Sequence, residues 1–111
     1  MPETPLSRAW QKTHELALAV YRLSQKLPEE EKFGLTAQMR QAAVAAASAL
    51  TECRELGTGA KGYVTGAAGE VAEVVYCLML ARDLGFVSEV DTREATALAT
   101  EALRMINGLR R

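Results

Sequence analysis

The stretch YVTGAAGEVAEVVYCLMLARDLG, residues 63–85, decides the fold. Apolar residues recur through it at alternating spacings of three and four, which is the heptad pattern of helices packed along a seam. The members of this seam are Val64, Ala67, Val71, Val74, Leu78, Ala81 and Gly85. Gly85 also marks the end of the helix, because glycine is a favoured residue just beyond a helix C-terminus. The pattern therefore predicts a helix over residues 63–84.

This stretch also carries more apolar surface than one seam needs. A helix that packs on one side requires an apolar stripe a little over 100° wide. The surplus residues beside the seam are Val75, Tyr76, Met79 and Leu80. Because surplus apolar area usually marks a partner surface, these four residues are the candidate oligomer interface. A closed symmetric homo-oligomer is the default assembly, and a somewhat apolar monomer surface is the alternative.

Three further helices are expected, over residues 6–26, 35–56 and 92–109. Each shows apolar residues three and four apart, the period of an amphipathic helix. The 111 residues suffice for one core, and a composition that is 49% hydrophobic but only 5% aromatic favours helices over a sheet. We therefore expect an all-α fold, an antiparallel up-down-up-down four-helix bundle that forms a single domain over residues 1–111.

The first two helices differ in the size of their buried residues. The stripe expected in the first helix is Leu6, Trp10, Thr13, Ala17, Val20, Ser24 and Leu27, flanked by Leu16 and Leu23. The stripe expected in the second is Met39, Ala42, Ala43, Ala46, Ala49, Leu50 and Cys53. The run AAVAAASAL, residues 42–50, is unusually small, so other helices can approach its backbone closely and their side chains must fill the core.

Local signals mark where the helices begin and end. Thr4 before Pro5 suits the start of the first helix. Leu27-Pro28 ends that helix, because the residue before proline is pushed out of the α region. The glycine-rich segment GTGAKG, residues 57–62, predicts a loop. Asp91-Thr-Arg-Glu94 has the spacing of a capping box for the last helix.

The connection PEEEKFGL, residues 28–35, separates the first two helices. Its glutamates are interpreted as solvated side chains. Phe33 is expected to pack back against the end of the bundle.

Charge and hydropathy restrict where the protein works. The formal net charge is −1, so the strong basic excess of many nucleic-acid-binding proteins is absent from the composition. No apolar run follows a basic start, as a secretory signal would require. The most apolar window, residues 67–81, contains two glutamates and is too short to span a bilayer. We expect a cytoplasmic protein with no membrane partner.

Residues able to carry chemistry are few. Cys53 and Cys77 follow no CxxC spacing and are interpreted as buried thiols. Glu70 and Glu73 share a helix face, but His14 is the only histidine, so the paired Glu-x-x-His motifs of a di-metal bundle site are missing. His14 is interpreted as structural. We expect no metal, no cofactor and no enzymatic activity.

Basic residues on the first two helices form the candidate nucleic-acid contacts. They are Arg8, Lys12, Arg22, Lys26, Arg40 and Arg54. Arg8 and Lys12 share a helix face, as do Arg22 and Lys26. In a ring their fields would add around the symmetry axis. Ordinary solubilising charge is the alternative interpretation.

The order of several short motifs resembles a known family. In the first half these are Trp10, Val20-Tyr21, Leu27-Pro28, Glu31, Phe33-Gly34-Leu35, Gln38, Arg40 and Ala42-Ala43-Val44. In the second half they are Gly69-Glu-Val-Ala-Glu73-Val and Leu78-Met-Leu-Ala-Arg-Asp-Leu-Gly85-Phe86. Together they resemble the bacterial four-helix-bundle proteins encoded in intervening sequences of large-subunit ribosomal RNA genes.

That resemblance implies a homopentamer without known enzymatic activity. A related branch, the accessory variability determinants of diversity-generating retroelements, binds nucleic acid and a reverse transcriptase as a pentamer. This sequence departs from the family pattern at residues 45–53, where Ala-Ala-Ala-Ser-Ala-Leu-Thr-Glu-Cys replaces Ser-Ile-Pro-x-Asn-Ile-Ala-Glu-Gly. Val75 also replaces a glutamate, and Met39 replaces a basic residue.

Two functions follow as hypotheses. The first is a non-enzymatic oligomeric scaffold that binds a protein partner. The second is an adaptor that binds RNA or DNA, for a ribonucleoprotein or a reverse transcriptase. An enzyme that depends on Glu52 or Glu73 is the least supported reading.

Overall fold

The structure is a computed structural model that describes residues 3–57 and 60–110, with the backbone alone at Ala60. Within these ranges the chain is all-α, with four long helices and no strand. The helices are α1 (Pro5–Ser24), α2 (Leu35–Leu56), α3 (Ala60–Asp83) and α4 (Glu89–Leu109), and a single 3₁₀ turn, η1 (Glu29–Glu31), precedes α2.

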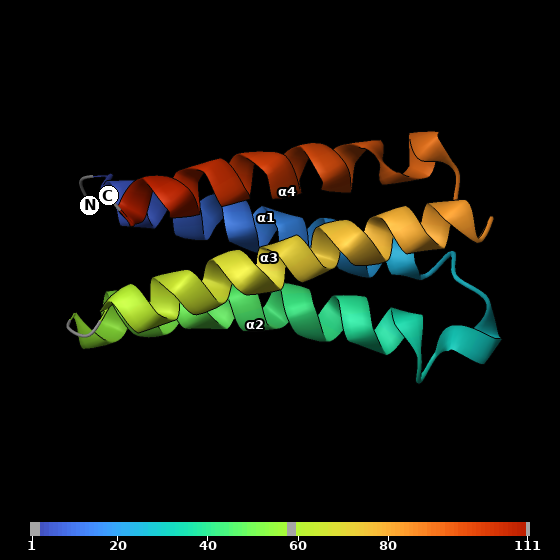
Figure 1. The fold of residues 1–111 in the computed structure, drawn as a ribbon, viewed down its shortest axis with the longest axis horizontal. Helices are drawn as coiled ribbons and strands as arrows, with labels where there is room; N and C mark the ends of the chain where they lie inside the picture. Colours follow the sequence, from blue (N-terminus) through green and yellow to red (C-terminus); the bar gives the residue numbers. More distant parts are fainter. Residues whose placement is uncertain (1–2, 58–59, 111) are drawn as a thin grey trace.

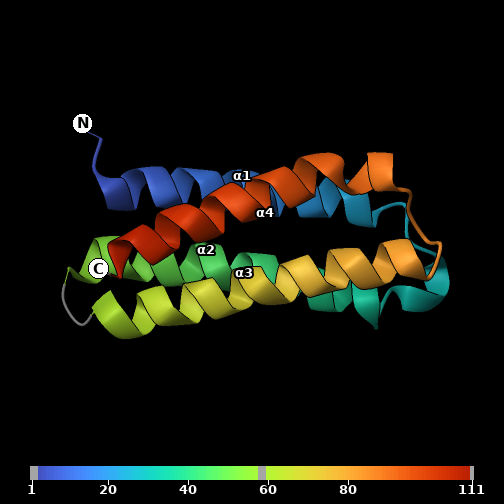
Figure 2. The same cartoon turned by 45° about the horizontal axis from the view of Figure 1, so that its top comes forward.

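The four helices lie lengthwise against one another. In Figures 1 and 2, α1 and α4 form one pair and α2 and α3 the other, and α1 begins at the end of the molecule where α4 ends. Each helix packs on the next in the chain, and α4 packs back on α1. The molecule measures 41 × 24 × 23 Å, and its contacts and connections are consistent with the expected up-down-up-down order.

One continuous core fills the space between the helices. Six of the seven residues of the predicted α3 seam are buried, which confirms the pattern that decides the fold. The seventh, Gly85, lies beyond the end of α3 and is exposed. The predicted stripe of α2 is buried as well, apart from Ala49, which is partly exposed. In α1, Leu16 and Leu23 are buried, whereas Trp10 and Ala17 are only partly so.

The start of α1 is as predicted and its end is earlier. The Thr4 hydroxyl accepts a hydrogen bond from the Ser7 backbone N–H (3.0 Å), and Pro5 opens the first turn. The helix ends at Ser24, two residues before the expected Lys26, and Leu27 is buried in the turn that follows.

The connection before α2 differs from both expectations. Phe33 does not pack against the bundle, because its side chain is 90% exposed. Glu31 is not simply solvated, because its Oε1 accepts a hydrogen bond from the Leu35 backbone N–H at the start of α2 (2.9 Å). Gly34 leaves room for this carboxylate, since a Cβ there would lie 2.8 Å from Glu31 Oε1. The acid thus satisfies one of the free N–H groups of α2.

The glycine-rich loop is shorter than predicted. Gly57 ends α2 in the left-handed conformation (φ 71°), which glycine adopts without a steric penalty. Ala60, Lys61 and Gly62 already belong to α3, so the expected loop over residues 57–62 is wrong in its second half. Thr58 and Gly59 lie outside the described residues.

The cap of α4 lies three residues before its predicted position. Ser88 is the N-cap, its hydroxyl accepts from the Asp91 N–H (3.1 Å), and Asp91 Oδ2 accepts from the Ser88 N–H (3.0 Å). Asp91 therefore completes the capping box from its third position instead of opening one. As expected, Gly85 follows α3, with φ 80°.

Within the described residues, one segment, Lys61–Asp83, is long and apolar enough to cross a membrane by length and composition alone. It exceeds the window of residues 67–81 that the sequence indicates. Of the 18-residue stretch that meets this criterion, 44% is buried inside the fold. The length and composition of this segment are also those of a core helix in a soluble protein.

Candidate interaction surfaces

The four residues of the candidate oligomer interface divide into two pairs. Val75 and Leu80 are partly buried and pack against the core of their own subunit. Tyr76 and Met79 are 59% and 46% exposed. The exposed pair therefore carries most of the surplus apolar surface.

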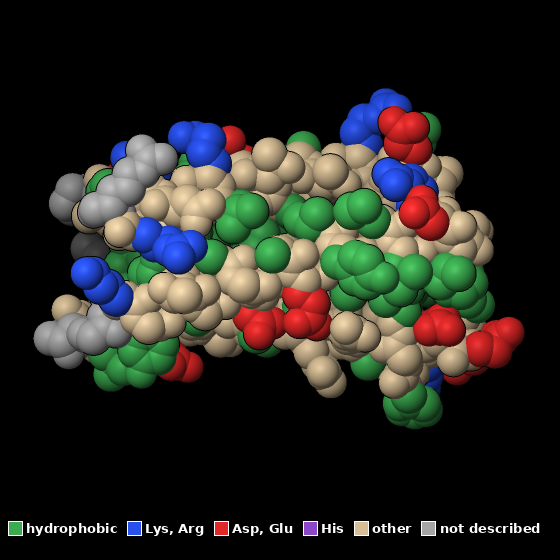
Figure 3. Space-filling model, in the orientation of Figure 1, with side chains coloured by type: hydrophobic (Ala, Val, Ile, Leu, Met, Phe, Trp, Pro, Cys, Tyr) green, Lys and Arg blue, Asp and Glu red, His purple; other side chains and the backbone are tan. Residues whose placement is uncertain are grey.

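Tyr76 and Met79 belong to a second line of residues on α3, which we call the outer seam. Its members are Gly62, Thr65, Gly69, Ala72, Tyr76 and Met79, and all of them are exposed. They alternate at spacings of three and four, as the buried seam does, and none is charged. In Figure 3 hydrophobic side chains gather over the right half of α3 and its border with α4, whereas fewer of them show over its left half. The periodicity of the outer seam was present in the sequence but was not singled out there.

A second exposed surface, which we call the α1–α2 groove, lies between those helices. Two adjacent open hollows of about 570 and 450 Å³ share Tyr21 and Val44. The groove is lined from α1 by Trp10, His14, Leu18 and Tyr21, and from α2 by Ala37, Gln41, Val44, Ser48 and Thr51. Sequence reasoning missed this surface because neither helix alone reveals it.

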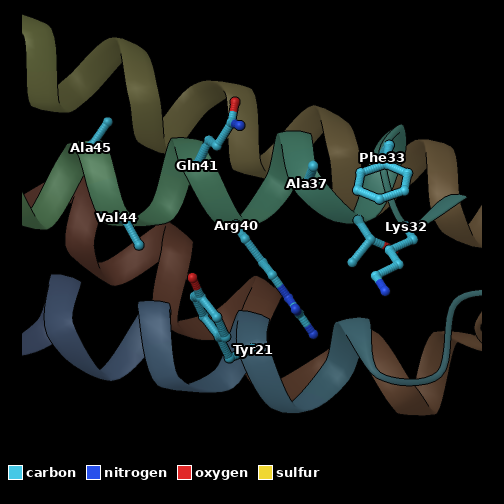
Figure 4. A pocket seen from close by; sticks show the side chains of 9 residues that line it. Tyr21, Lys32, Phe33, Ala37, Arg40, Gln41, Val44 and Ala45 are labelled. Carbon is cyan, nitrogen blue, oxygen red and sulfur yellow. The ribbon is translucent and has the colours of Figure 1, made fainter.

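Two arginines of α2 stack on aromatic rings of α1 at this groove. The guanidinium carbon of Arg40 lies 4.7 Å from the centre of the Tyr21 ring, and its Nε donates to Ser24 Oγ (2.7 Å). Figure 4 shows Arg40 extending from α2 past Tyr21, with Lys32 and Phe33 together near the start of α2. Cation–π contacts of this kind hold the charge at a fixed place.

The second arginine repeats the arrangement toward the other end of the groove. Arg54 lies 4.7 Å from the centre of the Trp10 ring. Trp10 stacks on His14, with ring centres 5.2 Å apart and planes 7° apart, and its Nε1 donates to Thr51 Oγ1 (2.8 Å). His14 is thus part of an aromatic stack.

None of the other four candidate nucleic-acid contacts lines this groove: three lie on α1, and Lys26 lies in the turn that follows it. Arg22 and Lys26 reach carboxylates of α4, with Arg22 Nη2 3.2 Å from Glu94 Oε1 and Lys26 Nζ 2.6 Å from Asp91 Oδ1. Arg8 and Lys12 form a separate i, i+4 pair nearer the start of α1. Lys12 pairs with Glu15 (3.4 Å), and Arg8 is exposed.

The structure therefore does not bring the six basic residues together. Arg40 and Arg54 border the α1–α2 groove, whereas Arg22 and Lys26 face α4. Exposed ion pairs such as Arg22–Glu94 contribute about 0–1 kcal/mol, so a stronger anion could displace the carboxylate. Nucleic-acid binding by these residues stays a prediction.

Comparison with known proteins agrees with the resemblance seen in the sequence. The model of the 23S rRNA-intervening sequence protein family matches residues 7–108. The chain belongs to this family. A search of curated proteins finds no match.

A solved structure shares the fold of this 23S rRNA-intervening sequence family member. It is a protein of unknown function from the S23 ribosomal protein family of Bacteroides thetaiotaomicron, solved at 1.70 Å resolution. The two share a TM-score of 0.84 and 16% identity over 93% of this chain and 98% of the other. At this identity the likeness shows the fold alone.

The remaining chemical groups of this family member are buried or dispersed. Cys53 and Cys77 are free and buried, and burial, with a smaller effect from Glu73, raises the pKa of the Cys77 thiol. Over residues 3–57 and 60–110, no three His, Cys, Asp or Glu side chains come close enough together to hold a metal ion.

Asp91 links the cap of α4 to the turn that follows α1, and this predicts a pH dependence. The Lys26 ammonium, followed by the Ser88 backbone N–H, lowers the pKa of Asp91 from 3.8 to about 2. A carboxyl with a lowered folded-state pKa stabilises the fold above its unfolded-state pKa, and this contribution is lost as the pH falls through the folded-state value.

We therefore expect Asp91→Asn to lower the melting temperature most above pH 4 and by a shrinking amount between pH 4 and 2. Thermal unfolding followed by circular dichroism across this range measures the difference. Glu94→Gln, which removes the acid paired with Arg22, is the control without a cap. A difference for Asp91→Asn that stays constant from pH 5 to 2 would contradict the linkage.

Proposed function

We propose that the chain is an antiparallel up-down-up-down bundle that assembles into a closed homo-oligomer and serves as a non-enzymatic scaffold for a protein partner. The observation that carries this proposal is the outer seam of α3. This helix already buries one seam in the core of its own subunit, and yet a second uncharged line of the same periodicity faces outward.

The exposure of the large side chains in the outer seam supports the proposal that another subunit covers them. Fully burying one large apolar side chain contributes about 1.5–3 kcal/mol relative to leaving it exposed. Tyr76 and Met79 are about half exposed in the subunit, so a partner surface could recover a substantial part of that amount for each. Tyrosine and methionine are also enriched at protein interfaces, whereas lysine and glutamate are depleted.

The number of subunits rests on the family. The resemblance to this family implies a homopentamer. In a ring, each contact joins two different patches of neighbouring subunits. The α1–α2 groove supplies a second exposed apolar patch in addition to the outer seam. Cytoplasmic placement and the lack of a cofactor belong to the same proposal.

A second function, binding of single-stranded RNA or DNA, is favoured by one specific observation. Arg40 and Arg54 hold positive charge against aromatic rings on the edge of an apolar groove, and arginine and aromatic side chains are the groups on which unpaired bases stack. The carboxylates paired with Arg22 and Lys26 oppose this function. It therefore remains the alternative to the scaffold.

Light scattering behind size exclusion at low salt, with absorbance at 260 and 280 nm, tests both functions. We expect an oligomer without nucleic acid, and a mass near five subunits if the family assembly is kept. Tyr76→Asp should shift the mass toward the monomer by burying a charge in the contact. Val90→Asp, at an exposed apolar site at the start of α4, should leave it unchanged.

A monomeric wild-type protein would contradict the scaffold. Co-eluting nucleic acid that is released by salt would favour the adaptor. In that case the double variant Arg40→Gln, Arg54→Gln should flatten the slope of log affinity against log salt by about 0.7 for each lost phosphate contact to a single strand.

A further inference from the structure

The α1–α2 groove is bordered by positive charge. Lys32 and Arg40 line its larger hollow, and Arg54 lies over Trp10 at the other end. Among the described residues, none of these three cations pairs with a carboxylate, and no aspartate or glutamate lines either hollow. An exposed apolar groove with this charge is complementary to an apolar helix face that is bordered by acids.

The outer seam of α3 is a face of this kind. Tyr76 and Met79 are its large exposed side chains, and Glu73 borders it. In the described part of the chain the Glu73 carboxylate forms no ion pair, and it accepts one long hydrogen bond, from Gln38 Nε2 of α2 (3.4 Å). Asp83 continues the seam four residues after Met79, is exposed, and pairs with the adjacent arginine. The large half of the seam is therefore also its acidic half.

We propose that the α1–α2 groove receives the outer seam of α3 from a neighbouring copy of the chain. The contact joins two different surfaces, so each subunit offers its groove to one neighbour and its seam to the other. Repetition of such a contact closes into a ring. This inference rests on the proposed self-assembly and specifies the surfaces that meet in it.

The heights of residues along the bundle fix the register of this contact. Gln38 and Glu73 lie at one height, because they share a hydrogen bond. In the proposed bundle order α2 and α3 run in opposite directions (Figure 1), and both rise equally per residue, so other heights follow by counting from this pair. Rotation about a ring axis that runs along the bundle changes no height. Glu73 of the partner subunit therefore comes within about 3 Å of the height of Arg40.

In this register the large side chains of the seam meet the larger hollow. Tyr76 and Met79 of the partner subunit come level with residues 32–35, at the end of the 570 Å³ hollow that Phe33 and Ala37 line. Figure 4 shows Ala37 between Arg40 and Phe33, with no large side chain of its own to fill the space. The hollow thus has room for the two side chains beside its cations.

The small half of the seam meets the bulky end of the groove. Trp10 donates to Thr51, which places it level with that part of α2, and His14 lies one turn further along α1. By the same count, Gly62 and Thr65 of the partner subunit come level with residues 46–49, beside these two rings. A Cβ at Gly62 would meet no atom of its own subunit within 4 Å, so its missing side chain leaves space only for a neighbour.

The opposite direction of the seam in the groove loses both matches. Its large residues would lie against Trp10 and His14, whose rings occupy that end of the groove. Lys61 of the partner subunit would approach Arg40, and like charges that face each other across an interface are destabilising. Size and charge therefore favour the direction that a ring produces.

Charge reversal tests the pair of Arg40 and Glu73. We expect Arg40→Glu and Glu73→Arg each to raise the concentration at which the assembly dissociates at least about tenfold, because like charges then face each other. The double variant should restore association, since the pair forms again between subunits with its signs exchanged. Sedimentation velocity over a range of concentrations measures the effect, and circular dichroism checks that each variant is folded.

Arg22→Glu is the matched control for these variants. Arg22 lies on α1 as an exposed residue and pairs with Glu94 of α4, on a side of the helix that does not line the groove. Its reversal should leave the association unchanged. Equal weakening by Arg22→Glu and Arg40→Glu would show a general effect of charge and would overturn the contact.

Disulfide cross-linking tests the register. Val44 lies where the two hollows join, and Gly69 of the partner subunit comes within two residues of its height, about 3 Å. The double variant Val44→Cys, Gly69→Cys should give a ladder of covalent multimers that ends at the size of the ring, because the close contact brings the two positions within the reach of a disulfide. Neither single variant should cross-link, because two copies of one position never face each other in a ring. The wild type, with its buried Cys53 and Cys77, controls for native thiols.

These outcomes separate the contact from the scaffold. An oligomer that dissociates in the single charge variants, returns in the double variant and cross-links as a ladder supports the contact. An oligomer that the charge variants leave intact, that the double variant does not restore, or that cross-links no further than a dimer overturns the contact and leaves the scaffold standing. A monomeric wild type overturns both.

Discussion

Leu50→Ala is expected to lower the free energy of unfolding by about 2–5 kcal/mol, the range for removing a fully buried leucine side chain. Leu50 is 0% exposed and lies at the end of the alanine run of α2, whose small side chains leave little material to fill a cavity. The cost should therefore fall in the upper part of that range, because residual cavity volume sets the penalty.

Urea denaturation followed by circular dichroism, at one fixed protein concentration, measures this loss. The concentration is fixed because self-association adds stability by mass action. Leu56→Ala, on the same helix and 58% exposed, is the matched control and should cost less than about 1 kcal/mol. Equal losses for the two variants would show that the core is not packed around Leu50.

Ala46→Leu is expected to lower the free energy of unfolding by about 1–3 kcal/mol for the opposite reason. Ala46 is fully buried in the alanine run of α2. The extra methylenes have no free volume, because protein interiors are packed at close to crystal density. Neighbouring side chains or the α2 backbone must then shift.

Ala97→Leu provides the comparison for Ala46→Leu. Ala97 is exposed on α4, where a larger side chain extends into solvent, so its variant should change stability by less than about 0.5 kcal/mol. The same denaturation experiment measures both. Wild-type stability in Ala46→Leu would mean that the helices around α2 are not closely packed.

The sequence predicts the fold of this chain well because helix period and burial coincide in α3. Six of the seven predicted seam residues are buried, all except Gly85, since a continuous three–four pattern leaves one orientation for the helix. In α1 the pattern was less decisive. Leu16 and Leu23 are more deeply buried than Trp10. Because α1 packs on both α2 and α4, its buried face is wide, and the sequence pattern alone does not show which residues lie at its centre.

The ends of the helices were harder to predict, because several neighbouring residues can serve almost equally well as the cap. Ser88 and Asp91 are both good N-cap residues, and only the backbone path shows that Ser88 occupies the position and Asp91 supports it. Glu31 and Phe33 show the same limit. The Glu31 carboxylate, expected to be solvated, accepts a hydrogen bond at the start of α2, and the Phe33 ring, expected to pack against the bundle, is exposed.

The interaction surfaces were predicted only in part. The surplus width of α3 could be read from the sequence, yet only Tyr76 and Met79 of the four named residues are well exposed. The six basic residues could not be sorted into two groups beforehand, because their separation depends on which neighbour each helix face meets. The α1–α2 groove requires two helices to be placed, so no single stretch signals it.

The order in which the helices touch has a consequence for how quickly the chain folds. Three of the four helix contacts join elements that follow one another directly, and only the contact of α1 with α4 joins distant parts of the sequence. Helical proteins dominated by such short-range contacts reach the native state in microseconds to milliseconds, because little chain entropy is lost before contacts form. A subunit that folds on this timescale is complete long before it meets a second copy at cellular concentration, so assembly begins with finished bundles.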